Sequence, residues 1–163
     1  MEFRTDCDPG HDDAIAILLA VHSPNIQLLG VSTGHGNAKP KDTHVNAVRL
    51  LHAFNAPVDV HAHRGAVKPL LRPVRTDPEI HGDDGLGGAD DLPTLDDPAV
   101  LERWQLDGQR SAVDGMAKAL KSVQSRHPIL PQFHDSFDTS YTVPCSGTRS
   151  LMVTKYVWQI RGR

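Results

Sequence analysis

The first 61 residues alternate between short apolar runs with the length of strands and longer segments with helical spacing of apolar residues. In order, the predicted elements are a strand that ends at Asp8, a helix over 12–22, a strand over 26–33, a helix over 41–55 and a strand over 58–61. Strands and helices in this order favour a parallel sheet flanked by helices. The sequence therefore predicts a Rossmann-like α/β fold, in which ligands bind at the carboxyl ends of the strands.

Four carboxylates lie within eight residues where the first predicted strand passes into the first helix. Asp6 and Asp8 point to the same face of an extended strand, because side chains alternate along it, and a Pro-Gly pair then turns the chain. Asp12 falls where an N-cap belongs and Asp13 in the first helical turn, where free N–H groups favour negative charge. Crowded anions repel one another unless some are protonated or a cation neutralises them. Oxygen ligands alone suit Ca²⁺ or Mg²⁺.

Two plainer interpretations of this segment are weighed against a cation site. Asp, Pro and Gly are common turn residues, and carboxylates at a helix start often serve only as caps. An EF-hand loop is excluded, because aligning Asp6 and Asp8 with its first and third positions places His11 at the invariant glycine. The same alignment places Ile17 at the terminal glutamate. A capping role for these carboxylates therefore remains an alternative to a cation site, whereas an EF-hand is excluded.

The segment from Asp6 to Ala14 reads Asp-Cys-Asp-Pro-Gly-His-Asp-Asp-Ala. It resembles the N-terminal fingerprint of the inosine-uridine-preferring nucleoside hydrolase family, with Cys7 in place of the commoner threonine. Further pieces follow in the order expected of that family: Gly30-Val31-Ser32-Thr33, Gly36-Asn37, Asn46-Ala47, Pro57-Val58, Pro69-Leu70, the run from His81 to Gly88, and Leu92-Pro93. The resemblance covers residues 6 to about 122 and includes a helix expected over 112–120.

The resemblance implies an enzyme that hydrolyses the N-glycosidic bond of purine or pyrimidine ribonucleosides to base and ribose. A Ca²⁺ ion held by Asp8 and Asp13 would activate a water molecule, and Asp8 would take its proton as the general base. The resemblance also implies that Asp12 grips the ribose hydroxyls. Asn37 would lie near the bound nucleoside, and His81 on a loop that covers the leaving base.

Asp6 is interpreted as a residue that supports the site from behind, by holding turn amides or the water of the metal. Cys7 is predicted to be a small core residue, because strand alternation points it away from the carboxylates. His61 and His63 have the spacing of a chelating pair on one strand face, but the sequence offers no third ligand for a transition metal.

The resemblance divides the chain into a nucleoside hydrolase-like portion, residues 1–122, and a divergent tail, residues 123–163. Family members are considerably longer, and their C-terminal part supplies metal and ribose ligands with no recognisable counterpart in the tail. We therefore expect an incomplete version of the fold, with a tail whose structure the sequence does not define. Residues 72–107 are rich in Pro, Gly and Asp and are predicted to form one long loop.

Charge and composition limit the classes of partner and the cell compartment expected for this chain. A net charge of −3 and a pI near 6.3 give no reason to expect nucleic acid, and no apolar run approaches the length of a membrane span. With two cysteines there is no disulfide framework, which favours a cytoplasmic protein. A small ribonucleoside is the expected partner, and the family resemblance adds a second copy of the chain.

Two other function classes remain open at this point. One is a truncated family member that binds a cation but hydrolyses nucleosides weakly or not at all. The other is a different aspartate-dependent metal hydrolase, such as a phosphatase, which would also need a phosphate-binding lysine in a recognisable motif. A ribose-release assay on inosine and uridine, beside a phosphatase assay, separates these classes.

Overall fold

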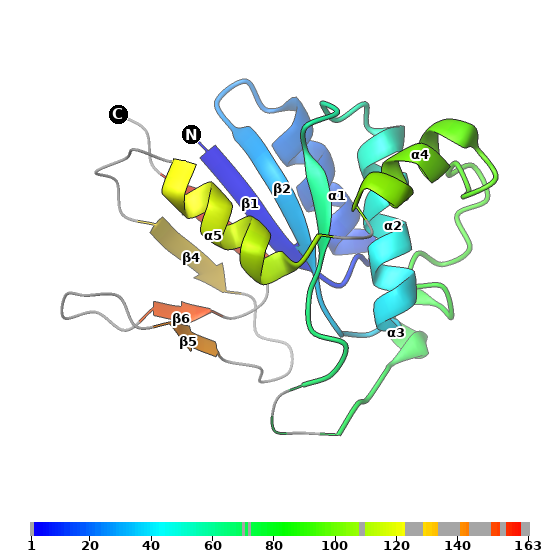
Figure 1. Ribbon diagram of the computed structural model, residues 1–163. Coiled ribbons are helices and arrows are strands. Elements are labelled where there is room, and N and C mark those ends of the chain that lie inside the picture. The colour runs from blue at the N-terminus through cyan, green and yellow to red at the C-terminus, as the bar shows by residue number, and fades with distance from the viewer. Residues whose placement is uncertain are drawn as a thin grey trace.

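The computed structural model describes residues 2–69, 71, 73–107, 110–122, 129–133, 141–143, 151–153 and 156–160, with side chains described between Cys7 and Ala119. Figure 1 shows the elements in chain order. They are β1 (Glu2–Cys7), α1 (His11–His22), β2 (Gln27–Thr33), α2 (Pro40–Ala53), β3 (His61–Arg64), α3 (Pro78–His81), α4 (Pro98–Asp107), α5 (Ala112–Ser122), β4 (Ile129–Phe133), β5 (Tyr141–Val143), β6 (Leu151–Val153) and β7 (Tyr156–Ile160).

The main sheet has the strand order β3-β2-β1-β7-β4. Strands β1, β2 and β3 are parallel, and β7 and β4 continue the sheet in antiparallel fashion. A second, two-stranded sheet pairs β5 with β6. The parallel part confirms the predicted α/β class. The antiparallel strands come from the segment after residue 122, where the sequence shows no sustained periodicity.

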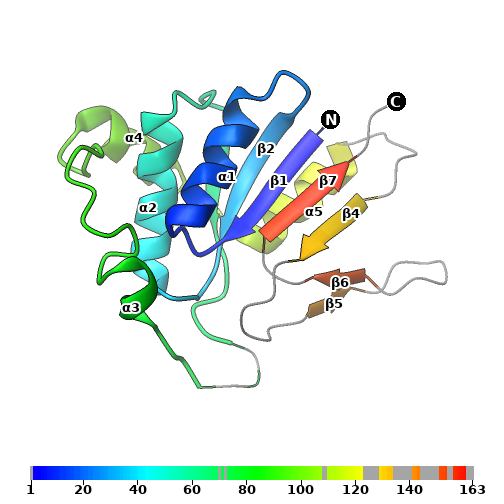
Figure 2. The same ribbon diagram turned by 180° about the vertical axis from the view of Figure 1, so that it is seen from behind.

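Helices cover both faces of the parallel strands. Figures 1 and 2 show α1 and α2 on one face and α5 on the other, with α4 packed beside α2. The carboxyl ends of β1 and β2 therefore open between helices at one end of the sheet. No helix in the described part of the chain is long and apolar enough to cross a membrane.

The core lies between the parallel strands and the helices on the α1 and α2 side. Its fully buried apolar side chains are Ile17 of α1, Val31 of β2, and Val48, Leu50 and Leu51 of α2. Burying each of these side chains contributes roughly 1.5–3 kcal/mol. Cys7, 2% exposed, belongs to the same cluster, which confirms its prediction as a core residue.

Two predicted element starts were wrong. The strand expected over 58–61 is β3, which begins only at His61, because Val60 N–H donates to the Pro57 carbonyl and closes a turn. Helix α1 begins at His11 with Gly10 as its N-cap, so Asp12 lies inside the first turn rather than at the cap. The backbone N–H of Gly10 donates to the Asp13 side chain, which fixes this earlier start.

The segment 72–107 is not one long loop, because it contains α3 and α4. Helix α4 begins where Asp97 accepts a hydrogen bond from Ala99 N–H at 2.8 Å, just before the favoured first-turn residue Pro98. Val100 then anchors the helix in the core with no exposed surface. The Asp-Pro pair was a signal for this helix that the composition of the segment concealed.

Candidate functional site

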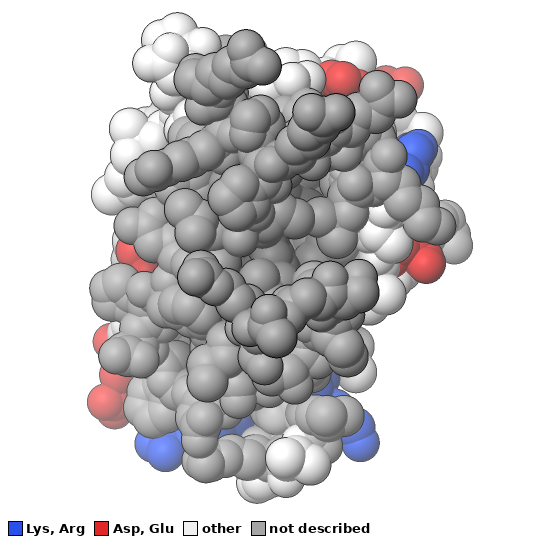
Figure 3. Space-filling model, turned by 90° about the vertical axis from the view of Figure 1, so that its left-hand side faces the viewer, with Lys and Arg blue, Asp and Glu red and all other residues white. Residues whose placement is uncertain are grey.

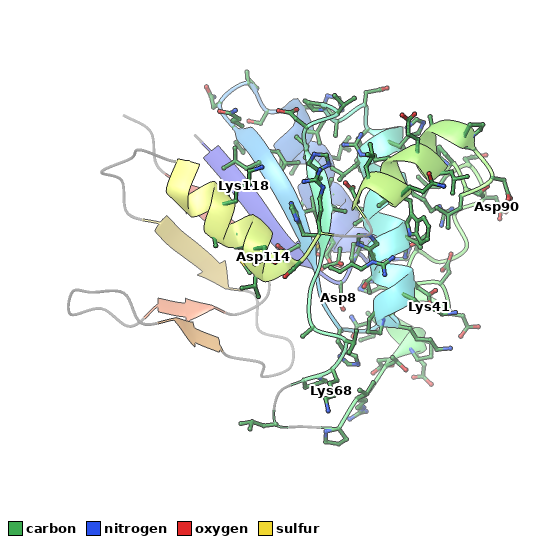
Figure 4. The ribbon with its side chains drawn as sticks, viewed as in Figure 1. Asp8, Lys41, Lys68, Asp90, Asp114 and Lys118 are labelled. Carbon is green, nitrogen blue, oxygen red and sulfur yellow. The ribbon has the colours of Figure 1, made fainter. Side chains whose placement is uncertain are left out.

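Asp8 lies directly after β1, at the end of the sheet where the chain turns into α1 (Figure 4). Its side chain is buried, and its Oδ2 atom accepts a hydrogen bond from the backbone N–H of Asn37 at 2.6 Å. Asn37 belongs to the loop between β2 and α2, so the ends of two neighbouring parallel strands meet here. The structure thus brings Asp8 and Asn37 together.

Gly36 allows that loop to lie against the carboxylate. A Cβ atom at position 36 would lie 1.6 Å from Oδ2 of Asp8, far inside any permitted contact. The neighbouring loop residue Gly34 has no such constraint, since a Cβ there would meet nothing within 4 Å. A glycine at position 36 is therefore part of the site, although sequence reasoning gave it no role.

Asp13 is the second buried carboxylate, 6% exposed, in the first turn of α1. Its Oδ2 atom accepts the N–H of Gly10 at 3.4 Å. Capping is therefore observed for this residue, as the plainer interpretation proposed. A capping contact does not by itself exclude metal ligation, since a carboxylate oxygen can accept more than one contact.

The carboxylates are the ligand type that a hard cation prefers, but two of them are too few to fill its coordination shell. Asp8 and Asp13 offer buried oxygen atoms from a strand end and a helix start, which is the ligand type that Ca²⁺ prefers. Ca²⁺ takes about 6–8 ligands. Among the described residues, no group of three or more His, Cys, Asp or Glu side chains is arranged to hold a metal ion. The two carboxylates alone are therefore fewer ligands than a Ca²⁺ ion takes.

Asp12 and His81 meet at the exposed rim of the site. Nε2 of His81 lies 3.4 Å from Oδ1 of Asp12, whose side chain is 74% exposed. His81 ends α3 and packs over Gly10, where a Cβ atom would lie 2.4 Å from its ring. His11, to which the sequence gave no role, touches the same ring, with the two Nδ1 atoms 3.3 Å apart. The predicted substrate residues Asp12 and His81 are thus neighbours.

The loop that follows His81 is held by internal hydrogen bonds and by a hydrogen bond to α2. The carboxylate of Asp84 accepts the N–H groups of Leu86 and Gly88, which outweigh the opposing effect of burial and hold the pKa of Asp84 below its usual range. Asn46 of α2 donates to the backbone carbonyl of Asp84 at 2.7 Å. The Asn-Ala and Asp-Asp-Gly motifs of the sequence therefore fix the loop that carries His81.

Asp6 is placed only by its backbone, which pairs with Ser32 in β2, and its side chain lies outside the described residues. Its supporting role stays a prediction. His61 is engaged elsewhere, because its Nδ1 lies 2.7 Å from the buried carboxylate of Asp107. The rings of His61 and His63 are 6.4 Å apart between centroids, at 85°. This arrangement favours a structural role over metal chelation.

His44 of α2 is the most perturbed histidine described. It is 2% exposed, and neither ring nitrogen has a hydrogen-bond partner among the described residues. Burial, helped by the positive charge of Arg64, lowers the pKa of His44 from 6.5 to about 4. The ring is therefore neutral at physiological pH.

Fold and site together define an α/β protein with a carboxylate site at the carboxyl ends of its parallel strands. The chain belongs to the inosine-uridine preferring nucleoside hydrolase family, whose sequence model matches residues 4–131. This confirms the resemblance based on the Asp6–Ala14 segment and the motifs that follow it.

Individual relatives agree with this membership. The chain is 40% identical over 124 residues to the pyrimidine-specific ribonucleoside hydrolase RihA of Escherichia coli O9:H4 (strain HS), which covers 76% of the chain and 36% of that protein. RihA of Salmonella enteritidis PT4 (strain P125109) is 38% identical over the same shares of each chain.

Solved structures show the same fold. An inosine-guanosine nucleoside hydrolase superimposes with a TM-score of 0.61 and 30% identity, over 74% of this chain and 33% of that one. A purine-preferring ribonucleoside hydrolase from Gardnerella vaginalis superimposes with a TM-score of 0.56 and 26% identity, over 71% and 35%. The chain therefore spans about a third of the length of the relatives that it matches.

Proposed function

We propose that the protein binds a ribonucleoside at the Asp8 site and hydrolyses its N-glycosidic bond with a metal-activated water. The observation that carries the proposal is the buried carboxylate of Asp8 after the end of β1, oriented by the backbone N–H of Asn37 and followed five residues later by the buried Asp13. The family membership and the names of the relatives support the substrate class.

Ca²⁺ is the proposed cation, held by Asp8 and Asp13, because the donors are carboxylate oxygens. A divalent cation, when bound, supplies charge that makes a nearby water easier to deprotonate. The remaining chemistry belongs to the side chains. Asp8 accepts the proton of the attacking water as general base, with its orientation fixed by the 2.6 Å hydrogen bond from Asn37.

Cleavage of the N-glycosidic bond gives the sugar oxocarbenium character, so positive charge develops on the ribose. The carboxylates of Asp8, Asp12 and Asp13 stabilise that charge electrostatically, most strongly where they are buried. Asp12 accepts hydrogen bonds from the ribose hydroxyls, and His81 lies on the side of the leaving base. Asp6 supports the site from behind.

Uridine is the first substrate to test, because the relatives at 40% identity are named as pyrimidine-specific. Inosine is the second, since the superimposed structures are named for purine nucleosides. On the face drawn in Figure 3, the described acidic and basic side chains are interspersed around the margin. We propose a cytoplasmic protein that acts on a small ligand, with self-association as a further property to measure.

The test of the cation uses thermal unfolding with and without millimolar Ca²⁺. Ca²⁺ is expected to raise the melting temperature, because a ligand that binds only the folded state stabilises it. Asp13→Asn should remove this increase, since it removes the charge while keeping an oxygen for the Gly10 cap. Asp90→Asn, at an exposed position far from Asp8 in Figure 4, should retain the increase. A melting temperature indifferent to Ca²⁺ in the unaltered chain would refute the site.

The test of the chemistry is ribose release from uridine and inosine at saturating Ca²⁺. Release that Asp8→Asn abolishes and Asp90→Asn preserves is the expected result. Release that survives Asp8→Asn would rule out Asp8 as the general base, and phosphate release from phosphomonoesters would favour the phosphatase alternative.

A further inference from the structure

His11 and His81 form a close pair at the rim of the site. Their Nδ1 atoms lie 3.3 Å apart, and their rings meet edge to face with centroids 5.3 Å apart. His11 is the first residue of α1 and His81 the last of α3, so residues 70 positions apart are joined. Figure 2 shows α3 at the end of the molecule where α1 begins.

Two glycines make room for this pair. A Cβ atom at Gly10 would lie 2.4 Å from the His81 ring, and one at Gly87 would lie 2.8 Å from Nε2 of His11. The N–H of Gly87 also donates to the carbonyl of His81 at 2.7 Å, and Gly82 closes α3 with a positive φ of 80°. The ring positions are therefore set by backbone that approaches from both sides.

Hydrogen-bond chemistry then selects one tautomer for each ring. A neutral imidazole carries one proton, so of two facing Nδ1 atoms one donates and the other accepts. If His81 donated from Nδ1, its bare Nε2 would face the carboxylate of Asp12 at 3.4 Å, lone pair against negative charge. If His11 donates instead, His81 carries its proton on Nε2 and donates it toward Asp12. Only the second arrangement satisfies both contacts.

We propose that His11 is a positioning residue: its Nδ1–H donates to Nδ1 of His81 and thereby keeps the His81 proton on Nε2, the atom that faces Asp12. The inference rests on the proposed function, because Asp12 and His81 are the residues proposed to contact the nucleoside. A ligand hydroxyl that donates to Asp12 can then accept from His81, and replaces the direct contact of the two residues. His11 itself touches no reacting atom.

The experiment reads the tautomers directly, in long-range ¹H–¹⁵N spectra of histidine-labelled full chain at pH 8. His81 is expected with its proton on Nε2 and His11 with its proton on Nδ1. His11→Leu should give His81 a mixture of both tautomers, whereas His11→Asn should retain the Nε2–H form, because an asparagine amide can donate from the position of Nδ1. His22→Leu, at the exposed far end of α1, is the matched control and should leave His81 unchanged.

Gly10→Ala provides a second variant that keeps His11 in place. Its methyl group displaces the His81 ring, so the same loss of the Nε2–H form is expected in the folded variant. A His81 proton on Nδ1 in the unaltered chain, or a tautomer indifferent to His11→Leu and Gly10→Ala, would overturn the proposal.

Uridine titrated into the same samples separates this proposal from the proposed function. Binding is expected to weaken by roughly 3–10-fold in His11→Leu, the cost of about one hydrogen bond, and to recover in His11→Asn. Unaltered spectra on adding uridine to the wild-type chain would count against the proposed function, while the tautomers would still decide the role of His11. Equal binding by the wild-type chain and His11→Leu would overturn the role of His11 alone.

Discussion

Gly36 is the residue on which the geometry of Asp8 most directly depends. A methyl group there would overlap the carboxylate, at 1.6 Å from Oδ2 and 2.0 Å from Cγ. Either the loop after β2 moves away or Asp8 changes its rotamer, and both break the hydrogen bond from Asn37. We predict that Gly36→Ala lowers the free energy of unfolding by about 1–3 kcal/mol and removes stabilisation by Ca²⁺.

Gly34→Ala is the control for this prediction, because it makes the same chemical change in the same loop with nothing within 4 Å of the new methyl group. It should unfold like the unaltered chain and respond to Ca²⁺. Urea unfolding with and without Ca²⁺ measures both quantities. Similar behaviour of the two alanine variants would show that the loop does not rest on Asp8.

His44 makes stability depend on pH. Its pKa is about 4 in the folded chain and near 6.5 when unfolded, so between these values the unfolded chain binds a proton that the folded chain does not. The contribution of His44 to the free energy of unfolding is therefore fully present above about pH 6.5. It falls as the pH drops toward 4, by roughly 3 kcal/mol in all.

Urea unfolding at pH 7.5 and pH 5 tests this effect. The unaltered chain should lose more stability between the two values than His44→Leu, and His22→Leu should behave like the unaltered chain because His22 is exposed. An equal loss in all three proteins would mean that His44 titrates normally in the folded state.

At the scale of elements, Asp107 at the end of α4 contacts β3 through its side chain. Its fully buried carboxylate accepts Ala62 N–H at 2.9 Å and lies 2.7 Å from Nδ1 of His61, and burial raises its pKa. We predict that Asp107→Ala costs about 2–4 kcal/mol of unfolding free energy, because a buried N–H and an imidazole lose their partner together.

Asp107→Asn keeps an acceptor for Ala62 and should cost distinctly less. Asp90→Ala, at an exposed position, should change the free energy of unfolding by less than about 0.5 kcal/mol. Denaturant midpoints of the three variants decide the matter. A cost for Asp107→Ala no greater than that of Asp90→Ala would show that α4 is held by its apolar contacts alone.

The elements also show what the sequence could and could not reveal. Helices α1 and α2 were predictable because their apolar residues recur at helical spacing, and α5 was expected from the family resemblance. Helix α4 was missed because acidic and proline residues dominate its surroundings, and only the Asp97 cap marks its start. The beginning of β3 depends on contacts from far along the chain, since the Arg103 guanidinium donates to carbonyls of Ala56, Pro57 and Val60.

The candidate site follows the same rule. Asp8 and Asp13 were predictable because a strand end and a helix start adjoin in the sequence, and burial of both carboxylates agrees with that prediction. His11 and Gly36 were not, because each matters through a partner in another segment: His81, 70 residues later, and Asp8, on the neighbouring strand. Local pattern cannot reveal such contacts.

At the scale of the whole molecule, the described residues form only part of the proposed site. Its relatives are about twice as long, since the matched segment is 76% of this chain and 36% of theirs. The described residues place two buried carboxylates, one exposed carboxylate and a histidine pair at the proposed site. We expect such a site to bind the proposed cation and ribose without holding them rigidly.

We therefore predict that the 163-residue chain hydrolyses uridine and inosine slowly. Each lost positioning contact can cost about a hundredfold in rate, because the ribose must be held within a fraction of an ångström of the attacking water. Ribose release should lie at least about 100-fold below the usual range of turnover numbers, about 1–10³ per second, and still depend on Asp8. The assay is ribose release at saturating Ca²⁺ over hours, with Asp8→Asn as the background. Turnover within the usual range, abolished by Asp8→Asn, would show that residues beyond those described, or a second subunit, complete the site.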